Sequence, residues 1–135
     1  MLDIIIYFWI ASLFLWIFIT LSPWFYNRRK ISRFKNRKYQ KKVSETLSQK
    51  KSTNEKIIIL DKILHNILLD MWYKWTLWEI LKQSPEYIHN IDKIWESHKI
   101  RNSLVHDLDN EYSEKFLHFK LAEFTKEIRM LLKNI

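Results

Sequence analysis

The sequence predicts an all-α protein, with one N-terminal transmembrane helix followed by a small bundle of four to five helices. Three observations support this prediction. An uncharged apolar run opens the chain, apolar residues recur at helical spacing after it, and no segment alternates polar and apolar residues as a strand does. The 135 residues include no Gly and two Pro, which favours helices joined by short polar loops.

Residues 1–27 are predicted to form a membrane anchor. The run from Ile4 to Leu21 has no charged side chain, and its eighteen residues would span roughly 27 Å as a helix, close to the thickness of a bilayer core. Ser22-Pro23 would end this helix, and Trp24-Phe25-Tyr26 would lie at the interface. One alternative is a cleaved signal peptide, but the segment lacks a positive start and a small-residue cleavage site. The other is a buried helix of a soluble domain, but the segment is apolar on every face and too hydrophobic for so small a domain.

Residues 28–51 are predicted to be a basic juxtamembrane linker that is helical from Tyr39. Nine Lys or Arg and no acid lie between residues 28 and 42, whereas residues 43–135 carry fourteen basic and fourteen acidic side chains. The positive-inside rule therefore predicts a membrane protein with its N-terminus outside and its C-terminal domain in the cytoplasm. DNA is not an expected partner. The side chains expected to meet anionic lipids are Arg28, Arg29, Lys30, Arg33, Lys35, Arg37 and Lys38. The alternative role for this strip is to attract RNA.

Residues 52–135 are predicted to form the helical domain. Ser52 and Glu55 have the spacing of a capping box, and Thr76, Asn90 and Ser113 can begin the later helices. Residues 85–89 and 107–111 are expected to be loops. The expected core comprises Ile59, Leu60, Ile63, Leu64, Ile67, Leu68, Met71, Ile91, Ile94, Trp95, His98, Val105, Leu117, Leu121, Phe124, Ile128, Leu131 and Ile135. The aromatic residues Trp72, Tyr73, Trp75 and Trp78 are also assigned to the core, with a partner interface as the alternative.

Composition excludes several classes of site. The absence of Cys excludes disulfides and thiolate zinc sites, and the absence of Gly excludes the phosphate-binding loops that need it. Glu86 and His89 have the spacing of a di-metal motif, but that motif must occur twice. We therefore expect no metal and no cofactor.

The segment from Trp95 to Asp107 concentrates polar groups in a helix that should be mostly buried. His98 and Arg101 are one turn apart and share a face, and Asn102 lies beside them. His106 lies off that face on an ideal helix. An Arg can bind phosphate and a His can transfer protons near neutral pH, which suits RNA chemistry. The structural alternative is that Arg101 pairs with a carboxylate and His106 interacts with the helix end.

The residues Arg101-Asn102-Ser103-Leu104-Val105-His106 resemble the R-x(4–6)-H motif of the HEPN superfamily of helical proteins. Residues 57–62 and 95–107 are also similar to bacterial proteins that pair one N-terminal anchor with a small helical domain. The resemblance covers roughly residues 55–133. It implies a four-helix domain that dimerises, which in many members is a metal-independent endoribonuclease and in others only binds nucleotides, RNA or proteins.

Carried onto this sequence, the resemblance implies that Arg101 binds phosphate, His106 serves in acid–base catalysis and Asn102 orients one of them. Glu96 and His98, in the same polar segment, are supporting candidates. We therefore expect a membrane-tethered HEPN-like homodimer that binds or cleaves RNA. The alternative is a non-enzymatic helical module for protein interaction or dimerisation at the membrane.

Overall fold

The computed structural model describes residues 7, 9–17, 31–71, 73–83, 85–106 and 112–135, and the chain divides into two units, residues 1–30 and Ile31–Ile135. Throughout the described ranges the regular secondary structure is helical, so the all-α prediction is confirmed. The helices of the second unit are α2 (Arg33–Ser48), α3 (Thr53–Asp70), α4 (Leu77–Lys82), α5 (Ile91–His106) and α6 (Glu114–Asn134).

The first unit is helical over residues 9–17, where the Ser12 hydroxyl donates to the Trp9 carbonyl oxygen, 2.9 Å away. Several of its large apolar side chains are exposed, including Trp9 at 71% and Phe14 at 67%. Both ends of the predicted span, 4–6 and 18–21, lie outside the described residues. Among those that are described, no helix is both long and apolar enough to cross a membrane.

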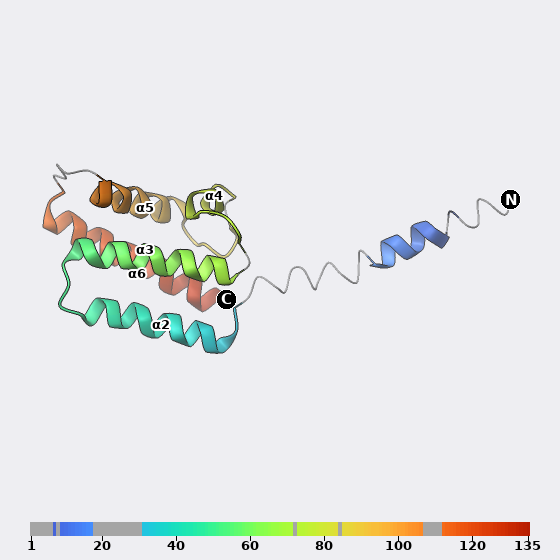
Figure 1. Ribbon diagram of the computed structural model, residues 1–135, viewed down its shortest axis with the longest axis horizontal. Helices are drawn as coiled ribbons and strands as arrows, with labels where there is room; N and C mark the ends of the chain where they lie inside the picture. Colours follow the sequence, from blue (N-terminus) through green and yellow to red (C-terminus); the bar gives the residue numbers. More distant parts are fainter. Residues whose placement is uncertain (1–6, 8, 18–30, 72, 84, 107–111) are drawn as a thin grey trace. The chain divides into compact units, whose positions relative to one another are not determined.

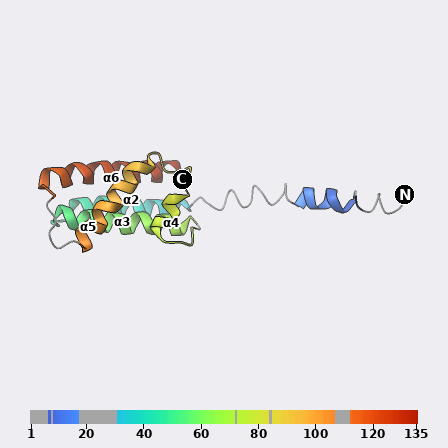
Figure 2. The same ribbon diagram turned by 90° about the horizontal axis from the view of Figure 1, so that it is seen from above.

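The second unit is a bundle in which α3 and α6 pack against each other and both contact α2 and α5 (Figure 1). Seen from above, α5 runs obliquely across α3 and α6 (Figure 2). The short helix α4 packs against α3. The helix α5 therefore has one border that faces α3 and a second border that faces α6, and polar side chains lie along both.

Local capping signals set the start of each helix in the bundle. Ser52 and Glu55 form the predicted capping box of α3, and Thr76 and Glu79 form another at α4. The Asn90 side chain accepts from the Lys93 amide at 3.1 Å, and that of Ser113 accepts from the Phe116 amide at 3.3 Å. These contacts satisfy amide groups that have no partner within the first turn of a helix.

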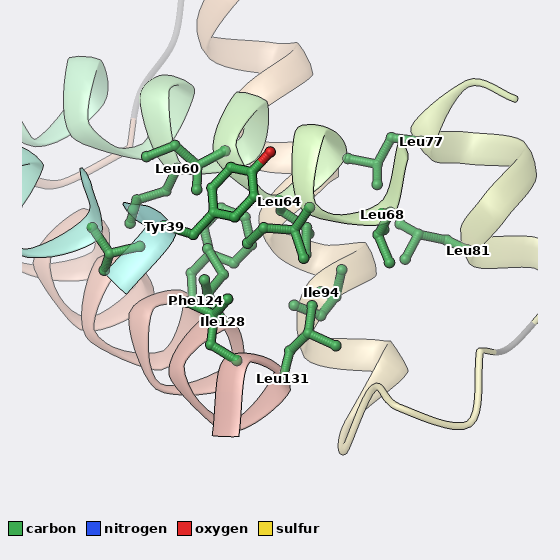
Figure 3. Close-up of a cluster of buried hydrophobic side chains, with 14 of the residues drawn as sticks. Tyr39, Leu60, Leu64, Leu68, Leu77, Leu81, Ile94, Phe124, Ile128 and Leu131 are labelled. Atoms are coloured by element: carbon green, nitrogen blue, oxygen red, sulfur yellow. The ribbon is translucent and has the colours of Figure 1, made fainter. Parts of the chain in front are cut away.

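The core lies where α2, α3 and α6 meet and continues toward α4 and α5. Tyr39, Leu60, Leu64 and Phe124 converge there from three helices (Figure 3). The predicted core positions of α3 and α6 are buried or packed against buried neighbours. On α5, Val105 is 46% exposed, so its predicted burial is wrong, and the fully buried part of this helix ends at Ile100.

The predicted linker and domain boundary differ from the structure. The compact unit begins at Ile31 and not at residue 52, because α2 is a packed member of the bundle. Tyr39 and Val43 are buried, and the Asn36 side chain donates to the Leu132 carbonyl oxygen at 2.7 Å. The apolar stripe of α2 is narrow and its other faces are basic, so composition alone gave it the appearance of a linker.

The predicted aromatic core is only partly present. Tyr73 is buried, as expected, but Trp75 is 53% exposed and Trp78 is 45% exposed. Trp72 lies outside the described residues. Large aromatic side chains are therefore accessible beside α4, where the sequence had assigned them to the interior.

Candidate functional site

A buried ion-pair cluster joins the middle of α3 to the second half of α5. Asp61 lies on the apolar face of α3, and its Oδ1 is 2.9 Å from Nδ1 of His98. The two side chains are 7% and 11% exposed. A buried carboxylate without a donor carries a large desolvation cost, so this pairing is needed wherever Asp61 is buried.

Arg101 and Asn102 complete the cluster. Nη1 of Arg101 donates to Oδ1 of Asn102 at 2.8 Å, and Nδ2 of Asn102 lies 3.3 Å from Nε2 of His98. If the Asn102 amide donates there, Nε2 of His98 is an acceptor and its Nδ1 carries the hydrogen that points to Asp61. The four side chains thus form a closed ring of polar contacts.

The Arg101 side chain is held in place, but not all of its N–H donors form hydrogen bonds within the described part of the chain. Its Nε is 3.6 Å from Oδ2 of Asp61, which is an ion pair but too long for a hydrogen bond. Nε is buried and has no hydrogen-bond partner among the described residues. The Arg101 side chain is 31% exposed, and a guanidinium has five N–H donors. The group is therefore oriented by the protein while retaining donors for an anion.

His106 is exposed on the last turn of α5. Within the described part of the chain, no hydrogen bond or ion pair joins it to Arg101 of the same copy. Helical spacing places it instead in line with Trp95, Lys99 and Asn102, at alternating steps of four and three residues. Asn102 therefore belongs both to the buried cluster and to this row, in which Lys99 and His106 are exposed and Trp95 and Asn102 are half-buried.

Glu96 belongs to a different cluster, on the border between α5 and α6. Its carboxylate accepts from Nζ of Lys120 at 2.7 Å, and Lys120 also donates to Glu123 at 3.0 Å. Lys93 reaches the other oxygen of Glu123 at 3.0 Å. The structure therefore brings His98 and Asn102 to Arg101 but directs Glu96 away from it.

These contacts shift two pKa values. Hydrogen bonds from Lys93 and Lys120 lower the pKa of Glu123 below its ordinary value. Burial acts to lower the pKa of Lys120, but the hydrogen bonds that Lys120 donates to Glu96 and Glu123, together with the negative charge of both carboxylates, outweigh it, so the pKa of Lys120 is raised. Both shifts favour the charged forms, and the α5–α6 cluster is a mutually neutralised network.

The predicted lipid-facing residues divide into two groups. Arg28, Arg29 and Lys30 lie outside the described residues. Arg33, Lys35, Arg37 and Lys38 are exposed on the first turns of α2. Lys35 also donates to Asp70 of α3 at 2.8 Å, so one of these cations helps to fasten α2 to the bundle.

Sequence reasoning missed Asp61 as a site residue. A signal was present, because Asp61 interrupts the apolar face formed by Ile57, Leu60 and Leu64. A lone carboxylate on a buried helical face needs a partner from another element. Which partner it meets depends on how α3 and α5 pack, and the spacing along one helix does not contain that information.

The described side chains include no group of three His, Asp or Glu residues placed to bind a metal ion. Comparisons with protein-family models, curated proteins and solved structures give no match for this chain.

Proposed function

We propose that this chain is a membrane-tethered, HEPN-like domain that binds or cleaves RNA at the cytoplasmic face. The observation that carries the proposal is the state of Arg101. Its guanidinium is oriented by Asp61 and Asn102, yet the side chain remains 31% exposed. A pre-oriented guanidinium with unused donors is well suited to bind a phosphate.

The proposed reaction is cleavage of the RNA backbone without a metal ion. A ribose 2′-hydroxyl loses its proton to a base as its oxygen attacks the adjacent phosphorus. The new bond closes a 2′,3′-cyclic phosphate, the bond between phosphorus and the 5′-oxygen breaks, and the 5′-oxygen takes a proton from an acid. Arg101 would stabilise the charge that develops on the phosphate oxygens, and Asn102 would keep Arg101 oriented. His106 would transfer these protons, because its imidazole is exposed and carries one nitrogen that can accept a proton and one that can donate it.

A homodimer would bring the two functional groups together. Within one copy, no described contact links Arg101 to His106, and both lie on the same exposed end of α5. A two-fold contact between the α5 ends of two copies would place His106 of each copy near Arg101 of the other. The small size of the bundle also favours self-association.

Cleavage can be tested with the full chain in detergent micelles, incubated with mixed RNA in EDTA. We expect products with 2′,3′-cyclic phosphate ends that are lost in His106→Ala and strongly reduced in Arg101→Lys. The Lys variant keeps a positive charge beside Asp61 but cannot make bidentate contacts. His118→Ala, which removes an exposed His from α6, is the control. RNA binding and cleavage that persist unchanged in folded Arg101→Lys and His106→Ala would refute the proposal.

A second candidate function is a non-enzymatic module that docks a protein partner at the membrane. Its support is the exposure of Trp75 and Trp78, since accessible aromatic side chains are common at interfaces. The two functions differ in what Arg101 does. If its role is only to neutralise Asp61, then Arg101→Lys will preserve every function of the protein.

The membrane location rests on the uncharged run at residues 4–21, the basic segment that follows it and the exposure of Trp9 and Phe14. A reporter fused after Ile135 should be active only if it is of the type that works in the cytoplasm. Activity of a reporter that works only outside the cytoplasm would reverse the proposed orientation.

A further inference from the structure

A second feature lies at the other end of the row that runs along α5 from Trp95 to His106, where Trp95 meets a second tryptophan. Trp78 of α4 and Trp95 of α5 have ring centroids 4.2 Å apart and ring planes at 78°. They border a cavity of about 370 Å³ that is also lined by Asp92, Glu96 and Lys99. Its volume is at the lower end of the range for small-ligand sites.

The cavity and the proposed RNA site lie on the same helix, α5. Trp95, Lys99, Asn102 and His106 follow one another at steps of four, three and four residues, so they lie along one face of the helix. His106 lies eleven positions after Trp95, which corresponds to about 16.5 Å along the helix axis. A single RNA strand of a few nucleotides could lie along this face, with one end at the tryptophans and the other at His106.

The residues around the cavity match the parts of a nucleotide. Aromatic rings stack on bases of any sequence, and the exposed Lys99 can contact the backbone phosphate. Asp92 is exposed and can accept a hydrogen bond from an amino group of a base, such as N4 of cytosine. Glu96 would repel phosphate if it were free, but Lys120 already neutralises it at 2.7 Å.

We propose that Trp78 and Trp95 form a base-stacking subsite for single-stranded RNA, with Lys99 as a phosphate contact and Asp92 as an acceptor for base amino groups. The inference rests on the proposed function, because it takes RNA as the ligand. It adds a binding site for a nucleotide next to the one at Arg101 and His106.

The test uses the full chain in micelles with EDTA and fluorescein-labelled octaribonucleotides of cytidine or uridine, carrying 2′-O-methyl groups that block cleavage. We expect Trp78→Ala to raise the Kd for the cytidine strand roughly five- to a hundredfold, as is typical for loss of one base–aromatic stack. Lys99→Ala, an exposed change that leaves the packing of α5 intact, should also raise the Kd. Trp75→Ala is the matched control, because Trp75 is 53% exposed and does not line the cavity.

The role of Asp92 predicts a preference. The cytidine strand should bind more tightly than the uridine strand, because O4 of uracil is an acceptor where cytosine has an amino donor. Asp92→Ala should remove that difference. Equal binding of both strands by the unchanged protein would overturn the role given to Asp92.

The outcomes separate the subsite from the proposed function. If Arg101→Lys weakens binding and folded Trp78→Ala and Lys99→Ala do not, the subsite is wrong and the RNA function stands; Trp78 is then free for protein docking. If Trp75→Ala weakens binding as much as Trp78→Ala, the effect is general aromatic adhesion and the subsite is also wrong. If neither the unchanged protein nor any of the variants binds RNA, both proposals fail.

Discussion

A polar cluster fastens α5 to a neighbouring helix along each of its two borders, and the two clusters differ in burial and in how their charges are paired. Toward α3, Asp61, His98, Asn102 and Arg101 form a ring in which the carboxylate is 7% exposed. Toward α6, Glu96, Lys120, Glu123 and Lys93 form a chain in which two of the four side chains are more than a third exposed. Both clusters fasten α5 to a neighbour, but only the first contains a buried donor, Nε of Arg101, that lacks a hydrogen-bond partner among the described residues.

This difference indicates which cluster is available for function. In the cluster on the α6 side, each carboxylate lies 3.0 Å or less from the Nζ atom of a lysine, so few of its charged groups remain available to bind a ligand. In the ring on the α3 side, Asp61 contacts both His98 and Arg101. The Arg101 guanidinium is held in place, but not all of its N–H donors form hydrogen bonds with residues that the structure describes. A buried polar group without a hydrogen-bond partner is rare in folded proteins and calls for an explanation, of which a functional role is one.

The largest expected effect is on the α3-side ring. Asp61→Ala should lower the free energy of unfolding by about 3 kcal/mol, because it leaves Arg101 and His98 facing a buried gap without an acceptor. Urea unfolding followed by circular dichroism would measure it. Asp61→Asn keeps one acceptor oxygen and should cost less. A loss from Asp61→Ala no greater than that from an exposed substitution would show that the ring does not fasten α5.

A smaller effect is expected on the α6 side. Lys120→Met should lower the free energy of unfolding by about 1 kcal/mol, because Glu96 is 48% exposed and stays hydrated, Glu123 keeps its ion pair with Lys93, and the Met retains the apolar part of the side chain. The same unfolding experiment applies, with Lys126→Met as a control at an exposed position on α6. If Lys120→Met destabilised the protein more than Asp61→Ala, the contrast between the two borders would be reversed.

The smallest expected effect is a dependence on pH. The pKa of Glu123 is lowered in the folded protein, so its contribution to stability is fully present above the unfolded value, about 4.3, and is lost as pH falls through the folded value. The unchanged protein should therefore be more stable than Glu123→Gln at pH 6. That advantage should disappear toward pH 3. A difference that stayed constant across this range would show that ionisation of Glu123 does not stabilise the fold.

Much of the fold could be predicted from the sequence, because the signals that decide it are local. Ser52 with Glu55, Thr76, Asn90 and Ser113 mark the starts of helices within four residues of the amides they cap. The apolar spacing of α3 and α6 defined their buried faces. The residues from Tyr39 onward were correctly predicted to be helical, but α2 begins at Arg33. Its membership in the bundle was not predicted, because its apolar stripe is narrow among basic side chains.

The candidate site was predictable only in part. That His98, Arg101 and Asn102 would share one region of α5 followed from their spacing, and so did the position of His106 away from Arg101. Asp61 was not predictable as their partner, because it lies 37 residues before His98. Glu96 was predicted as a supporting residue, but the packing of α5 against α6 pairs its carboxylate with Lys120.

The sequence by itself determined the helices, their caps, the uncharged N-terminal run and the basic segment that follows, because each of these depends on side chains a few residues apart. The tertiary structure decided which polar groups are buried together, which tryptophans are exposed and where Arg101 finds its counter-charge. Those outcomes depend on how one helix lies against another, and that arrangement is set by the whole core and not by the spacing within any one helix.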